Sequence, residues 1–219
     1  MIPVFASWHL QKRQQLKTEG AFLERKSVIR IREVQKAVEL IKTKSELIAY
    51  LKHIGYNKKE NEYRIAVEAL IFTPAGKLLL EKRGPLCRDE VGKLEGVGGR
   101  LKQDDLLYEL HEEFDEELAA EAQELEIEID RMLEIRQVQF EEKDKGLQDW
   151  IVVSYLCRLK KGIPAIGEPG KIESLHEVDL QDLYAMEEAR LSNSTIAARK
   201  VYQARFGNCP YYEVAEKNV

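Results

Sequence analysis

The chain has 219 residues, of which 44% are hydrophobic and 33% charged, which predicts one packed domain with attachments and excludes wholesale disorder. Its net charge of −5 does not favour generic binding to nucleic acid or to anionic membranes, so we expect neither partner. The three cysteines, Cys87, Cys157 and Cys209, lie far apart and indicate neither a zinc site nor a disulfide framework.

The first residues, "MIPVFASWHLQKRQQ", lack the cationic segment and apolar run of a secretory signal. No apolar run approaches the ~18 residues that a membrane-spanning helix needs. Unpaired cysteines are typical of a reducing compartment. These features together predict a cytoplasmic protein.

Residues 1–60 are expected to form an N-terminal helical extension, separate from a domain over residues 61–219. Apolar residues recur at helical spacing in residues 34–44, where Val34 and Val38 share a face. Residues 45–56 read as a second helix that Ser45 caps and Gly55 ends in a left-handed conformation. Because both helices carry apolar faces, the extension either forms a homodimer or packs back on its own domain.

Strand patterns dominate the middle of the chain, over residues 63–72, 78–83, 135–142 and 150–159. The first two are joined by a short turn, which predicts a hairpin. Glycine-punctuated loops are predicted over residues 84–99 and 160–174. Residues 178–191 begin a helical C-terminal section that runs toward Phe206. Strands surrounded by helices predict an α/β or α+β sandwich.

The helix predicted from residue 106 is unusually acidic. Thirteen acidic residues and no Lys or Arg lie between Asp104 and Asp130. On a helical wheel Leu107, Leu110, Phe114 and Leu118 form an apolar stripe, and Glu113 and Glu117 lie together on its flank. Like charges four residues apart are destabilising. The counter-charge therefore comes from basic residues elsewhere, from divalent cations such as Mg²⁺ or Mn²⁺, or from solvent alone on an ordinary surface helix.

The loop and helix together resemble the box of the Nudix hydrolases, G-x5-E-x7-R-E-U-x-E-E-x-G-U, where U is a bulky apolar residue. Gly98 takes the first glycine, Asp104 the first Glu, and "EFDEE" at residues 113–117 the E-U-x-E-E core. The segments "AVEALIFTPAGKLLLEKRGP", "GKLEGVGGRL" and "DWIVVSYLCRL" resemble the family's flanking elements. The resemblance covers residues 62–190 and implies an α/β/α sandwich with a mixed β-sheet.

Two positions depart from the family's pattern. Glu112 stands where the family has an Arg that braces the catalytic Glu, so a basic residue from elsewhere is expected to brace the helix, with Arg100 and Arg83 as candidates. Ala119 replaces the glycine that ends the helix, which leaves the helix free to continue toward Glu124.

The resemblance implies hydrolysis of a nucleoside diphosphate linked to another moiety, by water that attacks one phosphorus of the P–O–P bridge. It assigns catalysis to Glu113, Glu116 and Glu117, and it assigns Mg²⁺ or Mn²⁺ binding to the same three residues and Gly98. A later carboxylate is expected to orient the water; the candidates are Glu168, Glu173, Glu141 and Glu142. Substrate contacts are expected from Arg100, Arg83, Arg88 and Glu168.

Two other classes of function remain open. The departures at Glu112 and Ala119 are compatible with a Nudix-fold module that binds a nucleotide or an ADP-ribose-like ligand without turnover. The helical extension is compatible with an unrelated acidic scaffold protein. For the hydrolase and for the binding module, the expected partner is a nucleotide-type small molecule.

Overall fold

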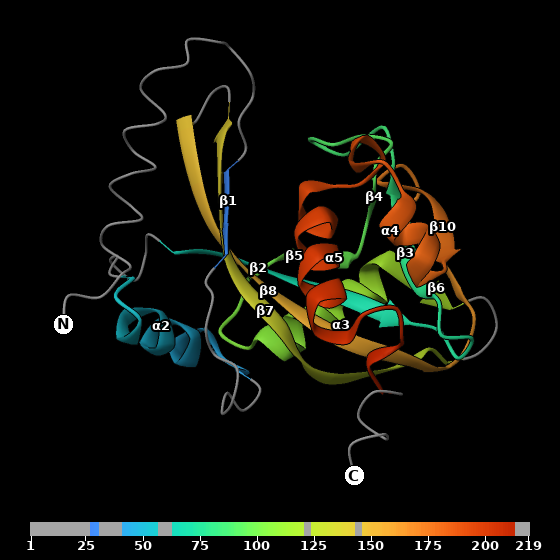
Figure 1. Ribbon diagram of the computed structural model, residues 1–219, viewed down its shortest axis with the longest axis horizontal. Helices are drawn as coiled ribbons and strands as arrows, with labels where there is room; N and C mark the ends of the chain where they lie inside the picture. Colours follow the sequence, from blue (N-terminus) through green and yellow to red (C-terminus); the bar gives the residue numbers. More distant parts are fainter. Residues whose placement is uncertain (1–26, 31–40, 57–62, 121–123, 143–145, 213–219) are drawn as a thin grey trace.

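The computed structural model describes residues 27–30, 41–56, 63–120, 124–142 and 146–212. Their centre is an eight-stranded mixed sheet with the path β1-β7-β8-β2-β3-β10, to which β5 adds by pairing with β2 and β4 by pairing with β3 (Figure 1). Strand β2 runs parallel to β8, and the other pairs are antiparallel. The bounds are β1 (Ser27–Arg30), β2 (Arg64–Phe72), β3 (Leu78–Arg83), β4 (Leu94–Glu95), β5 (Val97–Arg100), β7 (Glu126–Glu142), β8 (Gly146–Lys161) and β10 (Ile172–Val178).

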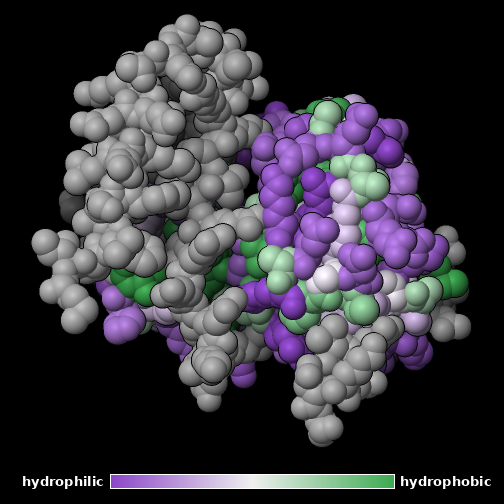
Figure 2. Space-filling view, viewed as in Figure 1, coloured by the Kyte–Doolittle hydropathy of each residue, from purple (hydrophilic) through white to green (hydrophobic). Residues whose placement is uncertain are grey.

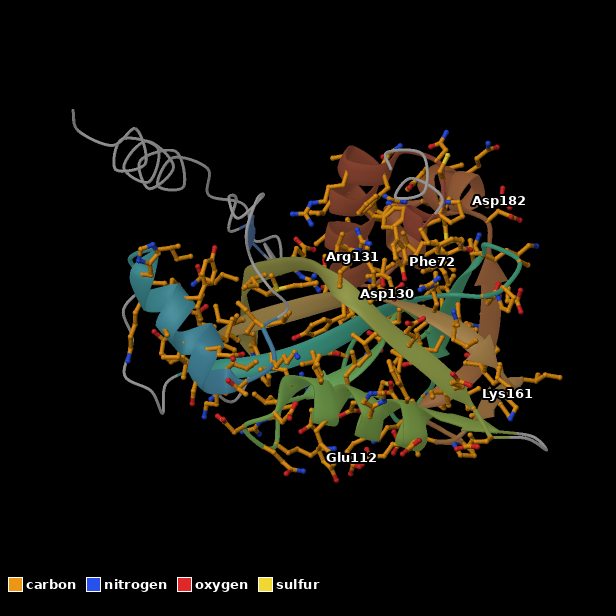
Figure 3. All side chains as sticks on the ribbon, turned by 90° about the horizontal axis from the view of Figure 1, so that it is seen from below. Phe72, Glu112, Asp130, Arg131, Lys161 and Asp182 are labelled. Carbon is orange, nitrogen blue, oxygen red and sulfur yellow. The ribbon has the colours of Figure 1, made fainter. Side chains whose placement is uncertain are left out.

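Helices cover both faces of this sheet (Figure 3). Helices α2 (Lys44–His53) and α3 (Leu106–Glu117) contribute to the core on one face, whereas α4 (Leu180–Ala185) and α5 (Asn193–Phe206) contribute to the core on the other. A 3-10 turn, η2 (Glu188–Arg190), joins α4 to α5. The expected α/β/α sandwich with a mixed sheet is confirmed.

Strand β2 shows why two separate cores form. Successive side chains of a strand point to opposite faces. Ile65 and Val67 therefore enter the core beside α2 and α3, and Leu70 and Phe72 enter the core beside α4 and α5. Burial on both faces explains why this strand and β8 read as almost continuous apolar runs.

A buried ion-pair network ties the central strands together beneath α5. The fully buried Arg136 of β7 donates to Glu68 of β2 at 2.6 Å and to Glu134 at 2.8 Å. Its guanidinium also donates to the hydroxyl of Ser154 on β8 and to that of Ser194 on α5. Buried charges are tolerated only when paired in this way, so the network rigidifies the scaffold that carries the site.

The four strands expected from the sequence are confirmed, but two expectations nearby are wrong. The segment 160–174 is not all loop, because it contains β9 (Pro164–Ile166) and the start of β10. The acidic helix does not continue toward Glu124: it ends at Glu117, and the chain enters β6 (Leu118–Ala120), which pairs with β9. The backbone groups that a longer helix would use are taken by this pairing and by the bond from the Gly167 N–H to the Glu117 carbonyl, at 2.9 Å.

The N-terminal region is only partly the expected helical extension. Residues 45–53 are helical, but α2 is capped by Thr43 in a capping box with Glu46, not by Ser45. Gly55 takes the expected left-handed conformation, with φ +87°. Upstream, Ser27–Arg30 is a strand, not a helix, and it extends the sheet beside β7. Val34 and Val38 lie outside the described residues.

Helix α2 packs on its own domain. Leu47 and Leu51 are fully buried, and Ile48 is nearly so, in the core that α3 shares. This apolar face is thus covered within the chain, as expected if the extension packs back on its own domain. Homodimer formation stays a prediction.

The described helices include none long and apolar enough to span a membrane. On the face shown in Figure 2, the visible described surface is mostly hydrophilic, with small separate hydrophobic patches.

Candidate active site

Helix α3 begins at a strong cap and lies with its apolar side on the sheet. The Asp105 carboxylate accepts the backbone N–H groups of Leu107 at 2.9 Å and of Tyr108 at 3.0 Å. Of the predicted stripe, Leu110, Phe114 and Leu118 are buried, whereas Leu107 is only half-buried and Leu106 takes its place. The flank of this stripe therefore turns Glu113 and Glu117 toward the sheet, where strand β5 ends.

Two glycines of β5 each have a close neighbour, which is the Glu113 carboxylate for Gly99 and the backbone of β2 for Gly98. A Cβ on Gly99 would lie 2.2 Å from Oε1 of Glu113, so this side chain occupies the space that any other residue at 99 would fill. A Cβ on Gly98 would lie 2.2 Å from the carbonyl oxygen of Val67 on β2. The Gly98 N–H donates to Oε2 of Glu117 at 2.9 Å. The "GG" thus seats the two glutamates against the sheet.

Lys102 supplies the counter-charge that the acidic helix lacks. Its Nζ lies 3.3 Å from Glu109, 3.4 Å from Glu113 and 3.3 Å from Glu116. These contacts raise the pKa of Lys102, although its partial burial opposes them. The bracing residue is thus neither Arg100 nor Arg83, and sequence reasoning missed it. Its position in the loop just before the acidic run was the available signal.

Glu81, which the sequence analysis also missed, adds a buried carboxylate from β3. It is 2% exposed, and its Oε2 has no hydrogen-bond partner among the described residues. Burial, and then the nearby charge of Glu117, raises the pKa of Glu81. Burial also raises the pKa of Glu117, while the bond from Gly98 N–H opposes the rise. The pKa of Glu113 is raised by burial too, against the opposing charge of Lys102.

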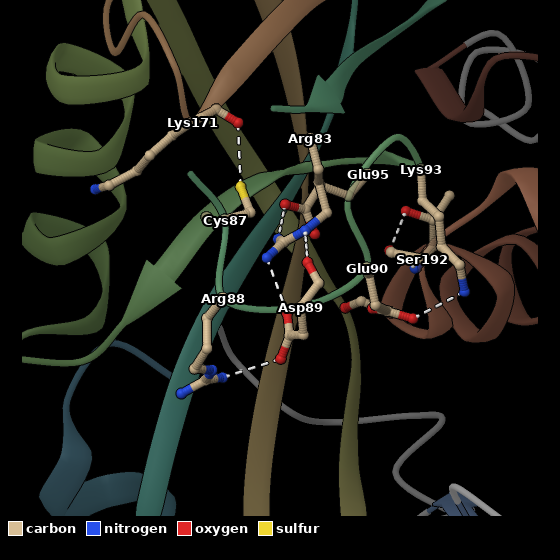
Figure 4. Close-up of polar contacts among 12 residues, drawn as sticks. Arg83, Cys87, Arg88, Asp89, Glu90, Lys93, Glu95, Lys171 and Ser192 are labelled. Carbon is tan, nitrogen blue, oxygen red and sulfur yellow. Dashed lines mark hydrogen bonds and ion pairs between the residues drawn. The ribbon is translucent and has the colours of Figure 1, made fainter. Parts of the chain in front are cut away.

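Arg83 holds the loop over residues 84–93, here called the approach loop, which connects β3 to β4 (Figure 4). Its guanidinium donates to the carboxylate of Glu95 and, at 2.9 Å, to that of Asp89. Burial raises the pKa of Glu95 to about 7, and Arg83 partly offsets that rise. Arg88 is exposed and pairs with Asp89 at 3.2 Å. The substrate contacts expected of both arginines stay predictions.

Glu168 is the loop candidate whose neighbour contacts α3, because the Gly167 N–H donates to the Glu117 carbonyl at 2.9 Å. Its negative charge is one of the causes that raise the pKa of Glu117, and Lys171 pairs with it at 2.7 Å. The approach loop holds this segment, because the Cys87 thiol donates to the Lys171 carbonyl at 3.1 Å (Figure 4). Glu173, on strand β10, instead pairs with Lys82 of β3 at 2.6 Å. The side chains of Glu141 and Glu142 lie outside the described part of the chain.

The oxygen donors around α3 fit a hard divalent cation in chemistry. Carboxylates suit Mg²⁺ and Mn²⁺, and Oε2 of Glu81 is a further buried oxygen without a hydrogen-bond partner among the described residues. As the described side chains lie, however, no three His, Cys, Asp or Glu residues are grouped closely enough to hold one ion. The ammonium of Lys102 lies among three of the glutamates instead.

No protein-family model matches the sequence, and no curated protein matches it. The fold is similar to a MutT Nudix hydrolase from Burkholderia pseudomallei, with 25% identity and a TM-score of 0.49 over 63% of this chain and 96% of that one. A Nudix hydrolase from Nitrosomonas europaea gives 16% identity and a TM-score of 0.49, over 67% and 90% of the two chains. The chain resembles the Nudix hydrolases.

A third similar structure is the Nudix domain of Shewanella oneidensis NrtR in complex with ADP ribose, at 15% identity and a TM-score of 0.49 over 70% of this chain and 96% of that domain. A UDP-X diphosphatase is similar at 18% identity and a TM-score of 0.46, over 75% and 73% of the two chains.

Glu112 replaces the Arg of the Nudix pattern without taking its place at the site. It lies on the outer side of α3, away from the sheet (Figure 3). Lys102, from the loop, contacts the buried Glu113 and the exposed Glu116 instead. The change at position 112 and the contacts of Lys102 thus move the positive charge from the helix to the loop.

Proposed function

We propose that this chain is a metal-dependent Nudix hydrolase that cleaves the pyrophosphate bond of a nucleoside diphosphate linked to another moiety. The observation that carries the proposal is the seating of Glu113 and Glu117 against the paired glycines of β5, with Glu116 beside them. Both carboxylates, whose pKa values burial raises, present oxygen ligands beside the strand. A cytoplasmic location suits substrates of this type.

In this proposal Glu113, Glu116 and Glu117, with the main chain of Gly98, hold Mg²⁺ or Mn²⁺. Held by these residues, such an ion would supply charge neutralisation of phosphate oxygens and acidification of water. Glu168 lies beside Glu117 on a loop fastened to the approach loop, so it orients the attacking water and accepts its proton. Positioning and charge stabilisation supply most of the rate enhancement, because phosphoryl transfer needs little covalent help from the protein.

A substrate panel tests the proposal. It contains ADP-ribose, NADH, a dinucleoside polyphosphate, a nucleotide sugar and a nucleoside triphosphate, each with Mg²⁺, with Mn²⁺ or with EDTA. Product formation that requires the metal supports hydrolysis. Absence of any product, with every compound and both metals, contradicts it.

A second candidate is a Nudix-fold module that binds a nucleotide without turnover. Lys102 favours it, because its ammonium already neutralises much of the charge that a metal site would need. The same panel separates the two. Saturable thermal stabilisation by a ligand that is recovered unchanged would indicate the binding module.

A further inference from the structure

A basic cavity of about 430 Å³ lies next to the glutamate cluster, between the start of α2 and the loop that follows β5. Four cationic residues line it, Lys44, Arg64, Arg100 and Lys102, together with one acidic residue, Asp104. The chain as a whole is acidic, with a net charge of −5, so this local excess of positive charge runs against its composition. Lys44 comes from outside the segment that resembles the Nudix family.

The acidic groups around this cavity are already engaged. Glu46 accepts the backbone N–H groups of Lys42 and Thr43, and Asp105 caps α3. Asp104 accepts from the Ser45 hydroxyl at 3.4 Å. Within the described part of the chain, no carboxylate forms an ion pair with the three cations other than Lys102. Arg64 donates to the side-chain oxygen of Gln148 and lies over the Trp150 ring, 5.9 Å from its centroid, so the charge open to a ligand is mainly that of Lys44 and Arg100.

Two helix N-termini add to the positive potential. Helices α2 and α3 begin side by side, since the Lys44 N–H donates to the Asp104 carbonyl and the Leu106 N–H donates to the Lys42 carbonyl, both at 2.7 Å. Each N-terminus carries roughly half a positive charge. The N–H groups of these first turns are taken by the two bonds above and by the caps, so the helix dipoles and the cations are what attract a phosphate here.

We infer that this cavity, here called the basic cavity, binds a phosphate group of the substrate that lies beyond the bond to be cleaved. Lys102 links the two places, because it lines the basic cavity while its ammonium contacts Glu113 and Glu116. This identification of the ligand as part of the substrate rests on the proposed function. It selects substrates with a further phosphate, such as nucleoside triphosphates and dinucleoside polyphosphates, over nucleotide sugars.

Binding of inorganic tripolyphosphate to the full chain in EDTA tests the cavity without metal or turnover. The informative variants are Arg100→Gln and Lys44→Gln, measured by isothermal titration calorimetry at low salt. The matched control is Lys160→Gln on β8. Arg64, which lines the cavity, pairs with Trp150 of β8. Lys160 lies ten residues further along β8, so it is ~33 Å from the cavity.

We expect each cavity variant to weaken tripolyphosphate binding about tenfold, as the loss of a charge-assisted hydrogen bond does, and the control to change it less than about twofold. Absence of saturable binding to the unaltered chain, or equal weakening by the control, would overturn the inference. Thermal melts of the three variants check that each is folded.

Kinetics separate this inference from the proposed function. If tripolyphosphate binding behaves as expected but no compound is hydrolysed, the cavity stands as an anion site and the proposed function fails. If hydrolysis occurs, Arg100→Gln should raise the KM for a nucleoside triphosphate about tenfold more than the KM for ADP-ribose. Equal effects on both substrates would show that the cavity does not hold a phosphate of the substrate.

Discussion

Replacing Lys102 with methionine tests whether its ammonium occupies the place of a metal ion. Methionine keeps an apolar stem of similar length and removes the charge. Glu109 and Glu113 then lose a cation, while their side chains are only 1% and 7% exposed. Glu116 is 47% exposed and loses less, because solvent screens it.

The expected magnitude follows from this burial. An exposed ion pair contributes about 0.2–1 kcal/mol, and removing the partner of a fully buried charge costs about 3–5 kcal/mol. Lys102 is itself 53% exposed, so the upper figure is discounted. We expect the variant to lose about 1–2 kcal/mol of unfolding free energy in EDTA. The same loss of competition should tighten Mn²⁺ binding by roughly 5- to 30-fold.

Urea unfolding in EDTA and in MnCl₂ measures both effects. Lys200→Met on α5 is the matched control, because Lys200 is 50% exposed and pairs with Glu188 at 2.5 Å on the opposite helical layer. Metal should stabilise the Lys102 variant more than the unaltered chain. It should stabilise the Lys200 control by the same amount as the unaltered chain. The reasoning fails if metal stabilises all three proteins by the same amount.

Four further substitutions have definite expected outcomes. Gly99→Ala should lower metal-dependent turnover more than about tenfold with little change in melting temperature, because the new Cβ meets the movable carboxylate of Glu113. In Gly98→Ala the new Cβ meets the backbone of β2, so this variant should have a strongly lowered melting temperature. Glu95→Gln should flatten the pH dependence of stability. The pKa of Glu95 is about 7 in the folded chain and 4.5 ordinarily, so the unaltered chain loses about 1–3 kcal/mol of unfolding free energy as pH rises from 4.5 to 7. Urea unfolding at several pH values measures this loss. Leu51→Ala should cost about 2–5 kcal/mol at any protein concentration, because α2 packs within its own chain; concentration dependence in the same assay would favour an intermolecular role.

The sequence predicted the fold well where local patterns and tertiary contacts agree. The continuous apolar runs of β2 and β8 could be assigned because both faces of these strands are buried. The end of α3 could not, because nothing local stops that helix. A distant segment does so, when β9 pairs with the residues after Glu117.

The site shows the same division. Helical spacing placed Glu113 and Glu117 on one flank of the helix, and the resemblance to the Nudix box selected them, but their contacts with Gly98 and Gly99 came from the structure. Lys102 had a single signal, its position just before the acidic run, and Glu81 had none, because it is a single acid in an apolar strand. Their roles come from the register of β3 and the path of the loop, which bring them to the same glutamates.

The most direct test of the central claim compares Glu117→Gln with Glu112→Gln. The two residues belong to the same helix and lose the same charge, but Glu117 lies against β5 and Glu112 lies on the outer side (Figure 3). On the best substrate of the panel, kcat/KM should fall at least ~100-fold in the first variant and change less than about threefold in the second. Equal kcat/KM values for the two variants would contradict a catalytic cluster on this face of α3.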